Sequence, residues 1–250
     1  MQSRNRFLTV IAAILTLLVI ALAGAAFYVH KNADALWEIV SERCVPGMKA
    51  NGHPAPCENV DEAKGYVTLK DRVGPLQFLL MPVAKISGIE DPQILYSHTP
   101  NFFALAWDAR HLMAERRGAF VSDSHVALAI NAEYSRTQNQ LHVHISCLRA
   151  DVRQQLDQLS TQLTSQWQPT TILKHSYFIR ALTLHELDEK SVFIRLAEEL
   201  PDARGEMWKY GMALAALPDG RLALMAIKEN WLKLNRGSGE EIQDHDCKIL

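Results

Sequence analysis

The sequence NAEYSRTQNQLHVHISCL, residues 131–148, places two histidines one residue apart in a segment with the pattern of a β-strand. Side chains alternate between the two faces of a strand. His142, His144 and Ser146 therefore share one face, and the apolar residues between them share the other. A polar row backed by an apolar face is typical of a site built on a packed sheet, so we take this strand as the starting point for fold and function.

The histidine pair is compatible with three roles. Two buried histidines can be core residues whose hydrogen bonds are satisfied. Imidazoles at positions i and i+2 can also ligate one metal ion, but no nearby residue supplies a third ligand at a familiar spacing. An imidazole can act as a nucleophile toward phosphorus when a neighbour fixes its tautomer. The flanking residues favour this third role, because Asn131 lies eleven positions before His142 and Gln138 lies four before it.

The order Asn131, Gln138, His142, His144 resembles the motif of the histidine-triad family of nucleotide hydrolases and transferases. The segment FLLMPVAKIS, residues 78–87, resembles the strand, proline and loop that cover the nucleotide in that family. The resemblance implies that His144 is the nucleophile and that His142 orients it or binds the phosphate. It also implies that Asn131 and Gln138 hold ribose or phosphate oxygens.

Two positions depart from the histidine-triad motif. Ser146 stands where the third histidine is expected, and Lys85 stands where a loop histidine is often found. Ser146 can still donate one hydrogen bond, and a phosphate monoester leaves as a stable anion that needs little help from a general acid. Lys85 could neutralise a diphosphate, or it could be a solvated loop lysine.

The N-terminal segment is apolar. Residues 7–29 include no charged residue, and this length suffices to span a bilayer as a helix. Two arginines precede the segment, which places the rest of the chain on the outer side of the membrane. We expect one transmembrane anchor over residues 1–30 and an exported catalytic domain over residues 31–250. A cleaved signal peptide is the alternative.

Four cysteines follow the apolar segment: Cys44, Cys57, Cys147 and Cys247. An even number in an exported domain indicates disulfides, with three possible pairings. We favour Cys44–Cys57 around a loop rich in proline and glycine, with Cys147–Cys247 as its complement. Four free thiols are the alternative. The net charge of −2 provides no basic field of the kind that binds nucleic acid.

The remaining pattern predicts an α+β fold: an antiparallel sheet of histidine-triad type with helices packed on it. Helical patterns cover residues 31–43, 90–117 and 150–165, and strand patterns cover 65–83, 125–133 and 141–148. A hairpin that begins at Tyr210 repeats the strand–turn–strand pattern that begins at Tyr66. Two interpretations stay open: chance similarity between apolar hairpins, or an internal pseudo-repeat of which only the first half has the histidine pair.

The whole chain, including the tail NRGSGEEIQDHDCKIL, resembles the bacterial CDP-diacylglycerol pyrophosphatases. This narrower family implies hydrolysis of CDP-diacylglycerol to CMP and phosphatidate through a cytidylyl-histidine, in phospholipid metabolism at the inner membrane, with the domain in the periplasm and no cofactor. Two alternatives stay open. One is a hydrolase of a water-soluble nucleotide diphosphate ester, and the other is an anchored metal-binding or scaffold module.

A diacyl substrate would need an apolar approach to the site. Trp107, Trp208 and Trp231 are candidates for such a surface, although a core position is the favoured interpretation for each. Glu240, Glu241 and Asp244 have the pattern of an exposed acidic face. Asp244 and His245 could instead pack behind the histidine strand if Cys147 and Cys247 are bonded.

Overall fold

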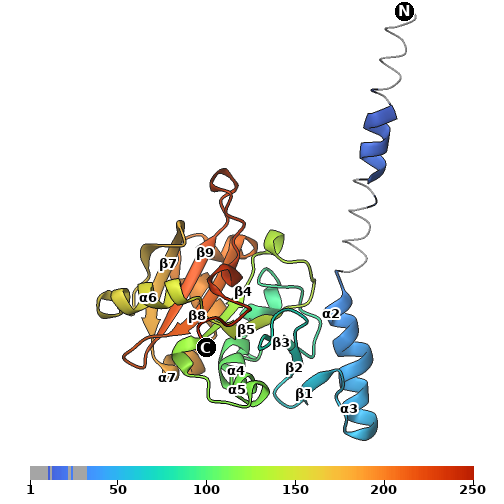
Figure 1. Cartoon of the computed structure of the whole chain (residues 1–250), viewed down its shortest axis with the longest axis horizontal. Helices are drawn as coiled ribbons and strands as arrows, with labels where there is room; N and C mark the ends of the chain where they lie inside the picture. The colour runs from blue at the N-terminus through green and yellow to red at the C-terminus, as the bar shows by residue number, and fades with distance from the viewer. Residues whose placement is uncertain (1–10, 12, 22–23, 25–32) are drawn as a thin grey trace, which may run out of the picture.

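The computed structural model describes residue 11, residues 13–21, residue 24 and residues 33–250. In this part of the chain, one antiparallel sheet has the strand order β1-β2-β3-β5-β4-β8-β9-β7-β6 (Figure 1). The strands are β1 Cys57–Asp61, β2 Tyr66–Lys70, β3 Phe78–Pro82, β4 Val126–Ile130, β5 Val143–Cys147, β6 Gln168–Ile172, β7 His175–Leu182, β8 Tyr210–Ala216 and β9 Leu222–Lys228.

Short helices connect and cover the strands (Figure 1). They are α2 Ala35–Glu38, the π-helical turn η1 Ile39–Cys44, α3 Val45–Asn51, α4 Phe102–Asp108, α5 His111–Arg117, α6 Ala150–Leu159, α7 Leu184–Glu189 and α8 Val192–Glu199. Side-chain hydrogen bonds cap the N-termini of two of these helices. The Asn101 side chain accepts a hydrogen bond from the Ala104 N–H before α4, and Thr183 and Glu186 form a capping box at α7.

The two faces of the sheet are covered differently. One face carries a large apolar core under α4, α5 and α8. The other face carries two separate clusters, one under α6 against β4, β7, β8 and β9, and one under η1 against β1, β2 and β3. Strand β5 lies between β3 and β4, so its second face falls between the two clusters. The fold thus leaves a gap in apolar packing at the strand that carries the histidines.

A single row of paired residues crosses the sheet at this gap. His144 of β5 pairs with Ala129 of β4, Ala129 pairs with Ala213 of β8, and Ala213 pairs with Met225 of β9. Without the edge strand β1, the strand order is symmetric about the β4–β8 junction, so Met225 occupies the position that mirrors His144. This symmetry sets the hairpin β8–β9 opposite β4–β5. The hairpin at Tyr66, which a pseudo-repeat would match to β8–β9, lies farther out.

The α+β class and the antiparallel sheet are confirmed, and the strands expected over 65–83, 125–133 and 141–148 are present. The prediction of a loop between Cys44 and Cys57 is partly wrong, because the helix α3 occupies Val45–Asn51. Proline is tolerated in the first turn of a helix, and α3 ends at Gly52, whose φ of 73° suits glycine. Strands β1, β6 and β7 were not predicted.

The predicted anchor over residues 1–30 lies mostly outside the described residues. Within the described part of the chain, no helix combines the length and the apolar character needed to cross a membrane. The anchor therefore remains a prediction. Both favoured disulfides are present: Cys44 bonds Cys57, and Cys147 bonds Cys247.

Candidate active site

Strand β5 presents its polar row as the alternation predicts. Val143, Ile145 and Cys147 belong to the large core. His142, His144 and Ser146 are also buried, with exposed fractions of 7%, 6% and 0%, but they lie on the opposite face. The three polar side chains thus lie together, buried, on one face of the strand.

His144 has one nitrogen engaged and one unoccupied. Its Nδ1 lies 3.3 Å from Glu240 Oε1 and 3.2 Å from the Gln77 amide nitrogen. Its Nε2 is buried and has no hydrogen-bond partner. One N–H of the Gln77 amide donates to Asp71 Oδ2 at 2.8 Å; at His144 Nδ1 the Glu240 carboxylate is the charged partner, and it is a strong acceptor for a ring N–H. We therefore assign the proton to Nδ1, which leaves the Nε2 lone pair available.

His142 is held in a fixed tautomer beside it. Its Nδ1 donates to the Gln140 carbonyl at 2.6 Å, and its ring lies edge-on to that of His144, with centroids 4.9 Å apart. Burial, and then the neighbouring His144, lower the pKa of His142 to about 4. Burial also lowers the pKa of His144. Both imidazoles are therefore neutral near pH 7, as a histidine nucleophile requires.

The C-terminal tail forms one wall of the site. Glu240 Oε1 accepts from His245 Nε2 at 3.0 Å as well as from His144, and Glu240 Oε2 accepts from the Asn131 amide at 2.8 Å. The Ser146 hydroxyl lies 3.3 Å from His245 Nδ1 and can donate to it. Burial acts to raise the pKa of Glu240, but the hydrogen bond from His245, the proximity of His144 and the Asn131 amide lower it to about 2.

Small residues and a disulfide hold the tail against the sheet. A Cβ atom on Gly239 would lie 2.3 Å from the Met212 carbonyl oxygen and 2.5 Å from that of Ile130. Only glycine permits this approach. Farther along, the Gln243 side chain donates to the carbonyls of Ala127 and His144 at 2.7 and 3.2 Å. The Cys147–Cys247 bond then ties the tail to β5 itself.

The structure places the other predicted substrate-binding residues near α2. Gln138 accepts from the Leu36 N–H at 3.1 Å. The Lys85 ammonium lies 3.3 Å from Asp34 and is about half exposed. Asn131 joins the histidine cluster, where its side chain contacts Glu240 and Ser238.

Three residues of this arrangement were not predicted from the sequence: Gln77, Gln140 and Glu240. Gln77 contacts His144, and Gln140 donates to the carbonyls of Pro82 and Ala84, both at 2.9 Å, which fixes the loop after β3. The interpretation of Glu240 as part of an exposed acidic face is wrong, since it lies between two histidines. His245 lies at the histidine strand because the Cys147–Cys247 bond holds the tail there. The pairing of these two cysteines predicted this position from the sequence.

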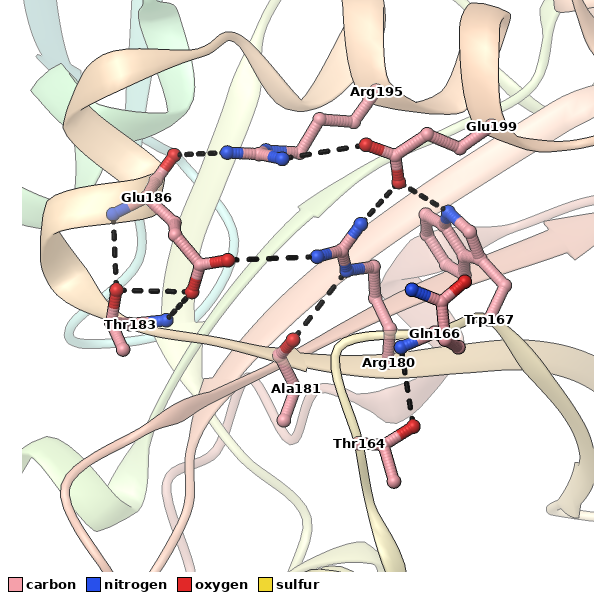
Figure 2. A network of polar contacts seen from close by, with 9 residues as sticks. All are labelled: Thr164, Gln166, Trp167, Arg180, Ala181, Thr183, Glu186, Arg195 and Glu199. Atoms are coloured by element: carbon pink, nitrogen blue, oxygen red, sulfur yellow. Dashed lines mark hydrogen bonds and ion pairs between the residues drawn. The ribbon is translucent and has the colours of Figure 1, made fainter.

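A pocket of about 510 Å³ lies elsewhere, at β7 and α8 on the opposite face of the sheet from the histidines. Figure 2 shows the polar network around it, in which Arg180 and Arg195 both pair with Glu199. The Trp167 indole also donates to Glu199, at 2.9 Å. Because the charges of this network pair with one another, we interpret it as a structural link between β7 and α8.

No group of three histidine, cysteine or acidic side chains within the described ranges is arranged to hold a metal ion. The three tryptophans differ in position. Trp107 is buried in the core, Trp208 is half-buried, and Trp231 is exposed.

The comparisons with known proteins identify the class of protein as a hydrolase. The family model for CDP-diacylglycerol pyrophosphatase matches residues 31–250. A protein of Yersinia pestis named CDP-diacylglycerol pyrophosphatase is 46% identical over 239 residues, which cover 94% of this chain and 93% of the relative. The chain therefore belongs to the CDP-diacylglycerol pyrophosphatase family.

Proposed function

We propose that the protein hydrolyses the pyrophosphate bond of CDP-diacylglycerol to CMP and phosphatidate, as a step of phospholipid metabolism. Family membership supports this substrate. The observation that carries the mechanism is His144, a buried imidazole whose Nε2 has no partner and whose Nδ1 faces a carboxylate.

In the first step, His144 Nε2 attacks the phosphorus next to the cytidine. The N–P bond forms as the bond to the bridging oxygen breaks, and the electron pair leaves with phosphatidate. Because Nδ1 keeps its proton, the ring of the cytidylyl-histidine is cationic. Glu240, whose pKa is about 2, stays ionised beside it and stabilises that charge.

In the second step, water attacks the same phosphorus. The N–P bond breaks, its electron pair returns to Nε2, and the water proton passes to solvent as CMP leaves. A phosphate monoester needs little protonation to depart, which accounts for a serine where the related motif has a third histidine.

We assign Glu240 and His245 as positioning residues for His144. Glu240 holds the Nδ1–H tautomer, and His245 holds Glu240 through its Nε2–H while accepting from Ser146 at Nδ1. Asn131 holds the other oxygen of Glu240. The tail thereby supplies the imidazole that β5 lacks. Gln138 and Lys85 remain proposed substrate-binding residues outside this cluster.

We further propose that residues 1–30 anchor the protein in a bacterial inner membrane, with the catalytic domain in the periplasm. The two disulfides support an oxidising compartment for this domain. A tether beside a bilayer-bound substrate raises its effective concentration.

The test is hydrolysis by the purified full chain of CDP-diacylglycerol and of soluble CDP-alcohols. We expect CMP release from the lipid, abolished by His144→Ala and retained in His185→Ala, which removes an exposed histidine paired with Glu189. A preference for the soluble esters would instead favour the water-soluble substrate class. Stoichiometric bound zinc or copper, lost in His142→Ala, together with no hydrolysis, would favour the metal-binding alternative.

A further inference from the structure

Residues 230–236, NWLKLNR, form an exposed loop between β9 and the tail that carries Glu240. Figure 1 shows this segment, in red beyond β9, projecting from the body of the protein. Trp231, Leu232 and Leu234 are 54%, 99% and 87% exposed. Three large apolar side chains at the tip of one loop are more than the scattered exposure that a protein surface usually shows.

The loop has a defined conformation. The backbones of Asn230 and Asn235 pair, the Asn230 side chain accepts from the Lys233 N–H at 3.2 Å, and the buried Asn235 side chain donates to the Lys228 carbonyl at 3.0 Å. Leu234 is held at a φ of 55°, a left-handed conformation that disfavours residues other than glycine. The fold therefore holds an exposed leucine in a strained conformation that gains no burial in return.

The charged residues of the loop are all basic. Residues 230–236 contain Lys233 and Arg236 and no acidic residue. Lys233 forms no ion pair within residues 33–250. Segments that bind an anionic membrane surface typically combine tryptophan and leucine with basic residues.

The loop adjoins the active site. Ser238, two residues after Arg236, pairs with Asn131, and the Arg236 guanidinium donates to the Tyr134 carbonyl. Tyr134 is half exposed and lies edge-on to Trp208, with ring centroids 5.6 Å apart. The loop and the segment that carries Asn131 therefore form one rim of the site.

We infer that the loop of residues 230–236 inserts Trp231, Leu232 and Leu234 into a bilayer surface that contains anionic lipid and so presents the site to lipid headgroups. The inference rests on the proposed function, since a lipid substrate is what makes this contact useful. A bilayer is favoured over a protein partner because three side chains offer less surface than a stable protein interface buries.

The first arm of the test compares two substrates with the full chain. One is long-chain CDP-diacylglycerol in vesicles of phosphatidylethanolamine and phosphatidylglycerol, and the other is a short-chain analogue dissolved as monomers. The double variant Leu232→Asp, Leu234→Asp should lower kcat/KM on vesicles on the order of 10-fold and leave the soluble analogue unaffected. Leu234→Gly should also lower vesicle activity, yet keep or raise the Tm, because glycine tolerates this φ.

The second arm measures quenching of tryptophan fluorescence by brominated lipids in the same vesicles. Quenching should fall in Trp231→Phe, and Phe120→Asp, which alters another exposed apolar residue, should behave as wild type in both arms. Equal losses on both substrates, or no loss with unchanged quenching in Trp231→Phe, would overturn the inference. If wild type hydrolyses neither substrate, the proposed function fails, and quenching through Trp231 still decides the membrane contact.

Discussion

Glu240 is the residue on which the state of His144 depends. It contacts the imidazole nitrogen opposite the free Nε2 and is itself held by His245 and Asn131. A neutral histidine can carry its proton on either nitrogen, and only the Nδ1–H form exposes a nucleophilic lone pair at Nε2.

We predict that Glu240→Gln lowers kcat on the order of 10²–10³-fold with a small change in KM, because the tautomer and the cationic intermediate lose their carboxylate. Burial lowers the pKa of His144, the charges of Glu240 and of Asp71 in the β2–β3 loop act to raise it, and His245 acts to lower it. The acid limb of the kcat/KM profile should therefore move to lower pH in this variant. Glu189→Gln, at the exposed His185 pair, is the control, and an unchanged kcat in Glu240→Gln would remove Glu240 from the mechanism.

His245 can be tested by chemical rescue because its side chain is partly exposed. We predict that His245→Ala loses activity on the order of 10-fold or more and regains part of it in added imidazole, which can refill the position between Ser146 and Glu240. His144→Ala should not be rescued to the same extent, since its replacement must form a covalent bond in fixed geometry. Wild-type activity in His245→Ala would show that Glu240 needs no support from the tail histidine.

At the scale of single residues, the sequence predicted the histidine strand but not the side chains that contact His144. Alternation alone put His142, His144 and Ser146 on one face, because side-chain direction in a strand is a local property. Glu240 reaches His144 across 96 positions of sequence, and a contact of that range leaves no periodic signal. The favoured Cys147–Cys247 pairing carried the needed information, since it fixes the tail beside β5.

At the scale of elements, the position of the tail beside the histidine strand depends on close backbone approach. We predict that Gly239→Ala lowers the free energy of unfolding by about 2–4 kcal/mol and abolishes most activity, because the added Cβ meets two carbonyl oxygens. Gly205→Ala is the matched control, as nothing lies within 4 Å of the added atom. Urea unfolding and kcat measured on both variants check this, and equal behaviour of the two would contradict the assigned packing.

Loss of the two disulfides should have different effects on kcat. The Cys147–Cys247 bond closes 100 residues and holds Glu240 and His245 at β5. We predict that serine replacement of this pair lowers both stability, by about 3–5 kcal/mol, and kcat. Replacement of Cys44 and Cys57, which are 13 residues apart beside β1, should cost stability and leave kcat nearly intact. Equal losses of kcat would place the first pair outside the catalytic arrangement.

At the scale of the whole molecule, the buried histidines make stability depend on pH. The pKa of His142 is about 4 when folded and 6.5 ordinarily. Between these values the unfolded chain binds a proton that the folded protein does not, so stability is lost as pH falls from 6.5 toward 4. We predict a loss of about 2 kcal/mol between pH 7.5 and pH 5 from this residue, reduced in His142→Gln. Urea unfolding at both pH values measures this loss of stability. If the free energy of unfolding depended on pH equally in wild type and variant, the burial of His142 as a neutral group would be contradicted.

The two-halved sheet was partly foreseeable from sequence. The hairpins at Tyr66 and Tyr210 are both real, but strand order pairs β8–β9 with β4–β5. Apolar hairpins resemble one another because the core imposes the same residues on each, so their similarity does not identify which ones correspond. Met225 mirrors His144, so the histidine pair has no counterpart across the β4–β8 junction.

The proposed mechanism requires that His144 form a covalent bond to the cytidylyl phosphorus. The most direct measurement incubates the full chain with CDP-diacylglycerol radiolabelled in that phosphate, quenches within seconds and assays acid-labile label on the protein. We expect label in wild type, none in His144→Ala, and slower labelling in Glu240→Gln. Label that persists in His144→Ala, or CMP release by that variant at the wild-type rate, would contradict it.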